Sequence, residues 1–295
     1  MRIGQLLLSE KNVSRVDLIG IVSHVLSLSR ERILMEPERV LDEAEQGKIG
    51  HAVGERRKGK PLAYLTNERE FFSEPFYVDE SVLIPRPETE LLVEEAIRII
   101  RTKDCPVVLD MGTGSGVIGI NLLKNGAGSV LCTDISPDAL AVARKNAHAL
   151  GLATGIAFVA SDLFSALKKG RSFDLICANL PYVALHEWEG LMPEVREFEP
   201  KGALVGGMKG TELYEKYLGE IGDYLKDTGV LLCEIGSEGQ AAPLGAVLKK
   251  SGFEVTVLHD LAGRERVIKA FVREKAGHPR EAGRGFAGGG GAEPR

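Results

Sequence analysis

The stretch Asp110-Met-Gly-Thr-Gly-Ser-Gly116 decides the fold, because it joins a short apolar run to a helical segment. The run before the glycines, residues 107–111, has the character of a buried strand. Glycines at alternate positions then let the backbone turn tightly and bring its N–H groups close to a ligand. This order of strand, loop and helix predicts the first unit of a doubly wound α/β domain.

Short apolar runs alternate with helical segments along the rest of the chain, as in a parallel sheet covered by helices on both faces. We expect strands at residues 107–111, 130–134, 156–160, 173–179, 230–235, 253–258 and about 266–272. The sequence therefore predicts an α/β protein with a class I Rossmann-like domain over residues 88–273, built on a mostly parallel seven-stranded sheet.

Three other segments have different sequence patterns. Residues 1–70 show helical spacing and no strand pattern, which predicts a small all-α N-terminal domain. Aromatic and β-branched side chains in residues 71–87, punctuated by Pro75 and Asp79, predict a β-hairpin that links the two domains. Residues 274–295 are rich in glycine and poor in large apolar side chains, so we expect a disordered tail.

Composition excludes several classes of protein. With 295 residues and 44% hydrophobic content, the chain can bury a substantial core. A net charge of -5 argues against stable nucleic acid binding through a basic face. No apolar stretch is long enough to span a membrane, and we expect a cytoplasmic protein with no membrane partner. We expect four buried thiols, without disulfides or a metal site, at Cys105, Cys132, Cys177 and Cys233.

The spacing of the glycine loop indicates which ligand it holds. A dinucleotide-binding fingerprint would place its third glycine at position 117, where this sequence has Val117. The spacing Gly-x-Gly-x-Gly instead favours S-adenosyl-L-methionine, which carries no pyrophosphate and presents a carboxylate and a sulfonium to the loop. The expected contacts in the loop are Asp110, Gly112, Thr113, Gly114, Ser115 and Gly116.

Acidic residues after the next two strands complete the expected cofactor site. Asp134 ends the second strand, where a carboxylate can accept hydrogen bonds from both ribose hydroxyls. Asp162 follows the third strand and is placed to meet the adenine amino group, with Leu163 against the ring. An acidic residue after a strand also commonly caps a helix, so both interpretations of Asp162 stay open.

Asn179-Leu-Pro-Tyr182 follows the fourth strand, at the edge of the predicted sheet that carries the glycine loop. The Asn179 side-chain oxygen, which also lies beside the cofactor, and the Leu180 carbonyl can each accept a hydrogen from a planar –NH2 group. Pro181 stiffens the turn, and Tyr182 can stack on the planar group. These residues are the candidate catalytic and substrate-binding set of a methyltransferase that acts on an amide or amine nitrogen.

From about residue 15 to 273 the chain resembles the protein-(glutamine-N5) methyltransferases of peptide chain release factors, the PrmC or HemK family. The two motifs above carry the resemblance, together with Ile84-Pro-Arg-Pro-Glu-Thr-Glu90, Pro61-Leu-Ala-Tyr64, Glu199-Pro200 and Asp260-Leu-Ala-Gly-Arg264. It implies methyl transfer from S-adenosyl-L-methionine to the glutamine of the Gly-Gly-Gln motif in release factors 1 and 2, which modulates translation termination. S-adenosyl-L-homocysteine is the implied product.

The resemblance further implies that the N-terminal domain engages the release factor and that Arg86, Pro87 and Glu90 border the substrate channel. Without the resemblance, residues 84–90 predict only the proline-rich start of a helix, with acidic residues in the favourable first turn. We also expect a monomer. The family usually has proline where this chain has Leu180, which keeps the carbonyl but adds an N–H group that needs a partner. We expect activity to be retained.

Three alternative functions remain open on the sequence alone. Enzymes that methylate a glutamine of a ribosomal protein have a similar hairpin, although Val-Pro-Arg-Ser-Pro typically follows it there. Adenine-N6 methylation of nucleic acid is the second alternative, because residues 179–182, here called the clamp, accept any exocyclic amino group. A non-catalytic protein that only binds the cofactor is the third alternative.

Overall fold

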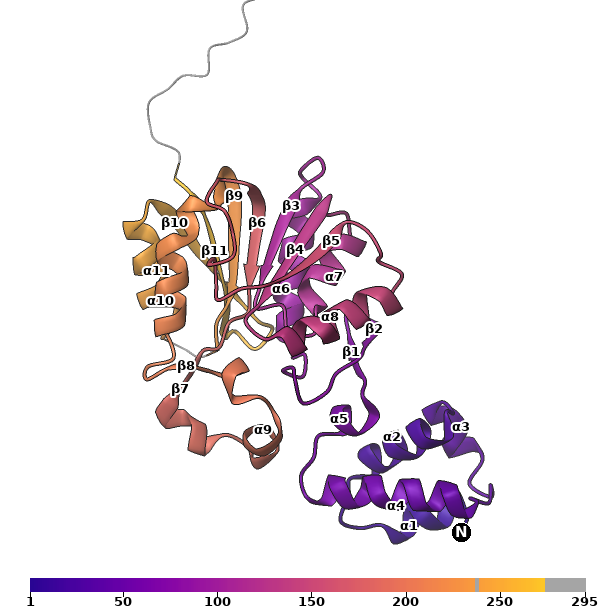
Figure 1. Cartoon of the computed structure of the whole chain (residues 1–295). Coiled ribbons are helices and arrows are strands. Elements are labelled where there is room, and N and C mark those ends of the chain that lie inside the picture. The colour runs from indigo at the N-terminus through magenta and orange to yellow at the C-terminus, as the bar shows by residue number, and fades with distance from the viewer. Residues whose placement is uncertain (237–238, 274–295) are drawn as a thin grey trace, which may run out of the picture.

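The computed structural model describes residues 1–236 and 239–273. It consists of a small helical domain and a larger α/β domain, connected by a thin segment (Figure 1). The expected tail, residues 274–295, lies outside the described residues. In the part of the chain that the structure covers, no helix is long and apolar enough to cross a membrane.

The helical domain has its own apolar core. Its helices are α1 (Ile3–Ser9), α2 (Arg15–Leu26), α3 (Arg30–Met35), α4 (Glu43–Arg57) and α5 (Leu62–Thr66). Ser14, Ser29 and Asp42 begin α2, α3 and α4, and the side chain of each accepts a backbone N–H from the third residue of its helix. Buried aliphatic side chains from these helices pack together. The expected all-α N-terminal domain is therefore confirmed.

A short β-hairpin follows the helical domain. It consists of β1 (Arg69–Phe71) and β2 (Glu74–Phe76) and turns at Phe72 and Ser73, which both have positive φ. The hairpin occupies only the first part of the expected linker, because Asp79 accepts the Ser81 N–H and bends the chain. Residues 77–87 are a loop whose apolar side chains form a separate buried cluster with Tyr64.

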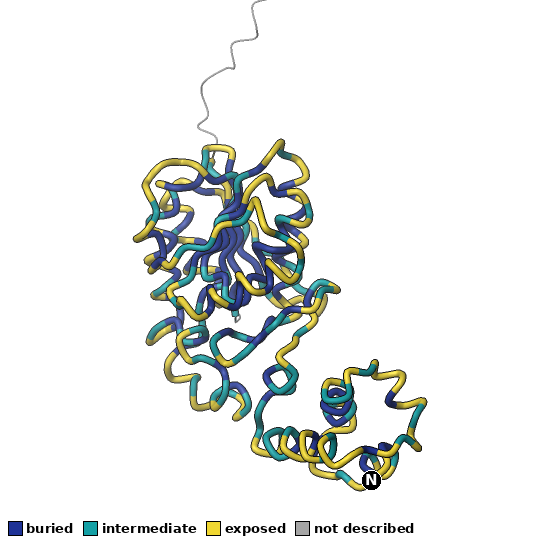
Figure 2. The backbone as a smooth tube through the Cα atoms, turned by 45° about the vertical axis from the view of Figure 1, so that its right-hand side comes forward, coloured by how far each residue is buried: buried dark blue, intermediate teal, exposed yellow. Residues whose placement is uncertain are grey.

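The α/β domain contains the seven-stranded sheet that the sequence predicted. The strands are β3 (Val107–Met111), β4 (Ser129–Asp134), β5 (Ile156–Ala160), β6 (Phe173–Ala178), β9 (Leu225–Glu234), β10 (Phe253–His259) and β11 (Glu265–Val272). Their order is β10-β11-β9-β6-β3-β4-β5, and β11 runs antiparallel to the other six strands. The sheet's central strands are buried along most of their length (Figure 2).

Helices cover both faces of this sheet, as predicted. One face carries α6 (Thr89–Ile100), α7 (Val117–Lys124) and α8 (Pro137–Ala149), whose apolar side chains join one core cluster. The other face carries α10 (Glu212–Glu220), the short helix η3 (Ile221–Asp223) and α11 (Ala241–Lys250), which join a second cluster. Of the four cysteines, three are buried within the sheet, but Cys105 is exposed, because it precedes β3 in a loop.

An insertion between β6 and α10 lies close to the carboxyl ends of the strands (Figure 1). It contains β7 (Val183–Ala184), η1 (Leu185–Gly190), α9 (Pro193–Phe198), η2 (Lys201–Ala203) and β8 (Val205–Gly207). A Cβ atom at Gly206 would lie 2.2 Å from the Pro181 carbonyl, and one at Gly210 would lie 2.3 Å from the Tyr182 carbonyl. The insertion can pack this tightly on the clamp because both positions are glycine.

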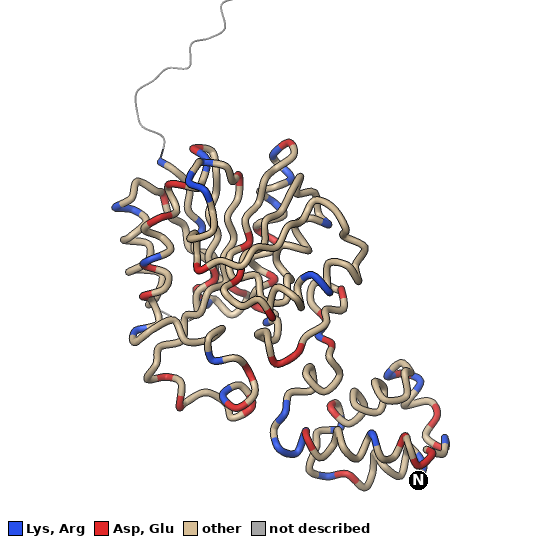
Figure 3. Tube along the Cα trace, in the orientation of Figure 1, with Lys and Arg blue, Asp and Glu red and all other residues tan. Residues whose placement is uncertain are grey.

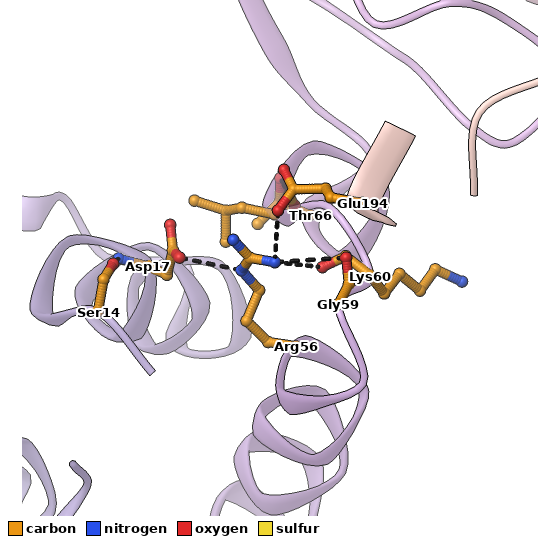
Figure 4. A network of polar contacts seen from close by, with 8 residues as sticks. Ser14, Asp17, Arg56, Gly59, Lys60, Thr66 and Glu194 are labelled. Carbon is orange, nitrogen blue, oxygen red and sulfur yellow. Dashed lines mark hydrogen bonds and ion pairs between the residues drawn. The ribbon is translucent and has the colours of Figure 1, made fainter. Parts of the chain in front are cut away.

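The two domains touch through Arg56, at the end of α4 (Figure 4). Its guanidinium binds Asp17 on α2 and Glu194 on α9, each at 2.9 Å. It also donates to the carbonyls of Gly59 and Lys60. A second ion pair joins Lys60 to Glu80 at 2.6 Å. The helical domain is thus attached to the insertion that borders the clamp.

Candidate active site

A cavity of about 330 Å³ opens at the carboxyl ends of β3, β4, β5 and β6. Most of the expected site residues line it, namely Arg86, Gly112, Thr113, Gly114, Ser115, Asp134, Asp162, Leu163, Asn179, Leu180 and Pro181. Five others lie next to the cavity lining without being part of it, namely Pro87, Glu90, Asp110, Gly116 and Tyr182. The glycine loop and the clamp therefore share one pocket.

The glycine loop is held against β4 and adopts a backbone that favours glycine. Gly112, Gly114 and Gly116 have φ values of 71°, 54° and 88°. The N–H groups of Gly112 and Thr113 donate to the Thr133 carbonyl at 2.8 and 2.9 Å. A Cβ atom at Gly112 would lie 2.9 Å from the Leu180 side chain. The loop thus forms a close cradle that leaves no room for side chains at its base.

Asp110 lies beneath this cradle and holds it in shape. Its fully buried carboxyl accepts the Thr113 hydroxyl at 2.6 Å and the Gly119 N–H at 2.9 Å. Burial raises the pKa of Asp110 to about 6. Its other oxygen, Oδ1, has no hydrogen-bond partner among the described residues. Asp110 therefore organises the loop from below rather than forming the wall of the cavity.

Asp134 and its neighbour Ile135 form the next part of the wall. The Asp134 carboxylate accepts the N–H groups of Gly114 and Ser136, both at 2.9 Å, and is fixed at the cavity. Ile135 also lines the cavity although 72% of its surface is exposed. Ile135 belongs to no motif that is recognisable in the sequence. Its exposure beside a carboxylate suits a residue that covers a flat ligand ring.

Asp162 and Leu163 lie across the cavity from this wall, after β5. Asp162 is exposed, and its carboxylate lies 3.5 Å from the ammonium of Lys216. Leu163 is buried with φ of 50°, which is unusual for a residue other than glycine. The Ser161 hydroxyl donates to the Leu163 carbonyl at 2.6 Å and stabilises this conformation. Strained backbone of this kind is common beside ligands.

The side chain of Asn179 lies beside two polar side chains, Thr89 and Glu234, which are far from it in the sequence. Its Nδ2 donates to the hydroxyl of Thr89, at the start of α6, over 3.2 Å. Glu234, at the end of β9, is 1% exposed and lies beside both side chains. Burial raises the pKa of Glu234 to about 7, against hydrogen bonds from Thr89 and Asn179 that lower it. This arrangement turns the Asn179 side-chain oxygen away from Thr89 and Glu234.

The rest of the clamp is also fixed by its neighbours. The added N–H group of Leu180 donates to the Tyr214 hydroxyl at 3.0 Å. The Tyr182 ring lies so close to Gly236 that a Cβ atom there would be 2.1 Å from it. The Tyr182 carbonyl accepts the Gln240 side-chain N–H at 2.9 Å. The Tyr182 ring thus packs against Gly236 and is not part of the cavity lining, and its stacking on a substrate stays a prediction.

The string at residues 84–90 has two distinct parts. Arg86 lines the cavity and pairs with the buried Glu199 at 2.6 Å, while the other Glu199 oxygen accepts the Ile84 N–H. Glu90 points away from the cavity and accepts the N–H of Phe72 in the hairpin. Only Arg86 of the three expected channel residues reaches the cavity. Glu199 belongs to one of the motifs that carry the family resemblance, and in the structure it positions Arg86.

Carboxyl groups dominate the electrostatics of this site. Acidic positions lie along the lower edge of the sheet, where the parallel strands end (Figure 3). Asp110, Asp134 and Glu234 lie around the cavity, whereas Arg86 is offset by Glu199. In the described part of the chain, no cluster of three or more ligating side chains could hold a metal ion. Asp134 and Asp162 line the cavity, so the site presents carboxyl groups to an organic cation such as a sulfonium.

The fold and this site define a class I S-adenosyl-L-methionine-dependent methyltransferase. A family model described as a methyltransferase domain matches residues 108–202, and one described as the PrmC N-terminal domain matches residues 2–66. A release factor glutamine methyltransferase of Nitratidesulfovibrio vulgaris is 40% identical over 89% of this chain and 90% of its own length. One from Rhodopirellula baltica is 36% identical over 86% and 88%. The chain belongs to the family of release factor glutamine methyltransferases.

Solved structures agree with the fold. A methyltransferase from Pyrococcus furiosus aligns with a TM-score of 0.53 at 16% identity, covering 76% of this chain and 98% of that one. A ribosomal protein L11 methylase from Lactobacillus delbrueckii subsp. bulgaricus aligns with a TM-score of 0.51 at 23% identity, covering 70% and 90%. At these identities the likeness concerns the fold alone.

Proposed function

We propose that this enzyme transfers a methyl group from S-adenosyl-L-methionine to the side-chain amide nitrogen, N5, of the glutamine in the Gly-Gly-Gln motif of release factors 1 and 2. The observation that carries the proposal is the single cavity in which the glycine loop and Asn179-Leu180 face each other. Family membership favours release factors over the ribosomal protein and the nucleic acid that the clamp alone would also admit.

The cavity fits S-adenosyl-L-methionine, which supplies an electrophilic methyl group when bound. Glycine at positions 112 and 116, where an added Cβ atom would lie within 2.9 Å of a neighbouring side chain, lets the loop backbone come close to the amino-acid part of the cofactor. Asp134 is fixed by two backbone N–H groups and retains lone pairs for the ribose hydroxyls. Ile135 and Leu163 would hold the adenine ring between them, with Asp162 at its amino group.

Asn179 and Leu180 would orient the acceptor amide. Thr89 accepts a hydrogen from Asn179 Nδ2, which leaves Oδ1 to accept one substrate hydrogen. The Leu180 carbonyl, which accepts no hydrogen bond from the described residues, would take the other. The nitrogen lone pair then forms the new N–C bond as the S–C bond breaks, and the nitrogen releases one proton to solvent. Orientation of the lone pair is the main contribution of the protein.

The proposed function also assigns a role to each domain, an oligomeric state and a location in the cell. The helical domain at residues 1–70 would engage the release factor, while residues 88–273 carry out the transfer. We propose that the enzyme works as a monomer in the cytoplasm without stable nucleic acid binding. The ion pair of Arg56 with Glu194 supports coupling between release-factor binding and catalysis, because it joins the helical domain to the insertion that borders the clamp.

A labelled-methyl experiment tests the proposal. The purified enzyme is incubated with labelled S-adenosyl-L-methionine and, in separate reactions, with release factors, a ribosomal fraction and duplex DNA. We expect label on the Gly-Gly-Gln glutamine, located by mass spectrometry of the digested release factor. Label that appears only on a ribosomal protein or on DNA would contradict the proposal, and cofactor binding without any transfer would favour a non-catalytic role.

A further inference from the structure

Leu180 is the position where the clamp departs from the family's usual proline, and its N–H group has a specific partner. The N–H donates to the hydroxyl of Tyr214 over 3.0 Å. Leu180 is 4% exposed and Tyr214 is fully buried, so water does not compete for this bond. A proline has no N–H group to donate. The hydrogen bond is therefore available only because residue 180 is not proline.

The Tyr214 hydroxyl connects two neighbouring strands. Tyr214 lies on α10, and its hydroxyl donates to the Glu234 carbonyl, at the end of β9, over 2.6 Å. The same oxygen accepts the Leu180 N–H just after β6. A longer contact of 3.4 Å joins the hydroxyl to the carbonyl of Ala178, the last residue of β6, so its single hydrogen is directed mainly at Glu234. The hydroxyl fixes the chain after β6 relative to the end of β9.

The Leu180 side chain makes a second contact that holds this residue. It packs on the glycine loop so closely that a Cβ atom at Gly112 would lie 2.9 Å from Leu180 Cδ2. Pro181 follows immediately and fixes its own φ. Leu180 is thus held through its N–H group, through its side chain and through Pro181, the residue that follows it. None of the described residues donates a hydrogen bond to the Leu180 carbonyl, which can therefore accept a hydrogen from a ligand in the cavity.

We propose that Tyr214 is a positioning residue for methyl transfer: its hydroxyl anchors the Leu180 N–H and so sets the direction of the Leu180 carbonyl. The anchor supplies through a tertiary hydrogen bond the stiffness that a proline would supply through its ring. Tyr214 is not among the residues that line the cavity, and it acts through Leu180. The inference rests on the proposed function, because that function assigns the carbonyl to the acceptor amide.

Replacing the hydroxyl alone tests this role. In Tyr214→Phe the buried Leu180 N–H loses its partner, and we expect kcat to fall about tenfold, in line with the cost of an unpaired buried donor. The KM for S-adenosyl-L-methionine should stay within about twofold, because the cofactor contacts are unchanged. Tyr217→Phe is the matched control. Tyr217 is also fully buried on α10, but its hydroxyl has no partner among the described residues. We expect Tyr217→Phe to change kcat by less than about twofold.

A double-mutant cycle with Leu180→Pro separates positioning from general stability. Leu180→Pro removes the N–H group, so adding Tyr214→Phe to it should lower kcat by less than about twofold. An equal tenfold loss with and without Leu180→Pro would show that Tyr214 acts independently of residue 180. A wild-type kcat in Tyr214→Phe alone would also overturn the proposal.

Hydrogen exchange gives a readout that needs no release factor. We expect amide exchange at residue 180 to accelerate at least about tenfold in Tyr214→Phe and to stay unchanged in Tyr217→Phe. Unchanged exchange in Tyr214→Phe would contradict the anchor. If instead the wild-type enzyme fails to methylate release factors, the proposed function fails, and the exchange rates still decide whether Tyr214 holds Leu180.

Discussion

At the scale of single residues, the site depends on how Asn179 is turned. Thr89 accepts a hydrogen from its amide nitrogen, and the buried Glu234 carboxyl lies beside both. An asparagine amide can otherwise present either its oxygen or its nitrogen to a ligand. If the Asn179 nitrogen faced the substrate amide instead, the N–H groups of the two amides would point at each other and repel. Thr89 and Glu234 therefore select the face of Asn179 that can accept a hydrogen.

Glu234 should also make stability depend on pH. Burial raises its pKa from an ordinary value of 4.5 to about 7 in the folded chain. The folded chain then holds a proton that the unfolded chain releases as the pH rises through 4.5. The contribution to the free energy of unfolding is therefore fully present below pH 4.5 and is lost as the pH rises through about 7.

Glu234→Gln tests this prediction, because glutamine keeps the shape and does not titrate. The free energy of unfolding, measured with urea from pH 4.5 to 8, should fall less steeply with pH in Glu234→Gln than in the wild type. The difference between the two proteins isolates this residue from all other titrating groups. Parallel pH profiles for the two proteins would show that Glu234 is ionised in the folded chain.

The sequence predicted those site residues that share one contiguous motif. The glycine loop and the clamp each act within a few residues, so their spacing carries the signal. Thr89 and Glu234 meet Asn179 only through the fold, since Thr89 precedes it by 90 positions. Glu234 did offer a weak signal, because a carboxylate at the end of a predicted parallel strand lies at the ligand-binding edge.

At the scale of elements, the glycine loop and the clamp are packed directly on each other. A Cβ atom at Gly112 would meet the Leu180 side chain at 2.9 Å, and Gly112 has φ of 71°. We expect Gly112→Ala to weaken S-adenosyl-L-methionine binding at least about tenfold, through backbone strain and this contact together. Isothermal titration calorimetry measures the affinity.

Leu180→Ala provides the control for that prediction. Combined with Gly112→Ala it removes the close contact and should recover part of the lost affinity, while Leu180→Ala alone should leave cofactor affinity within about threefold of the wild type. If the double variant binds no better than Gly112→Ala, backbone strain alone accounts for the loss and the packing contact contributes nothing.

The strands were predictable and the connections were less so. Strands buried on both faces form continuous apolar runs, and all seven expected strands appear in the sheet. The hairpin was expected to be longer because Val78, Val82 and Ile84 resemble strand residues, yet they are buried by packing in a loop. The insertion after Tyr182 gave no regular pattern, because its elements are only two to six residues long.

At the scale of the whole molecule, Arg56 joins the helical domain to the insertion (Figure 4). Its side chain is 18% exposed and that of Glu194 is 41% exposed, so the ion pair is partly screened by water. We expect Glu194→Gln to raise the KM for the release factor by about twofold to fivefold, with cofactor affinity unchanged. Steady-state kinetics at low and high salt checks this, because salt should shrink the difference.

Arg57→Gln is the matched control for the domain contact. Arg57 lies next to Arg56 on α4 but pairs with Glu10 inside the helical domain. Arg57→Gln changes the net charge by one unit, in the opposite direction to Glu194→Gln, and leaves the contact with the insertion intact. An equal rise of KM in Glu194→Gln and Arg57→Gln, whose charge changes are opposite, would show that the loss of either ion pair matters rather than the fixed domain contact.

The most direct test of the account is single-turnover methylation of an intact release factor by the wild type and by Asn179→Ala, with cofactor affinity measured on the same preparations. The wild type should place one methyl group on the amide nitrogen of the Gly-Gly-Gln glutamine. Asn179→Ala should bind S-adenosyl-L-methionine within about threefold of the wild type and transfer the methyl group at least about 100-fold more slowly. Equal transfer rates, or a methyl group on another residue, would contradict the claim that the clamp orients this amide.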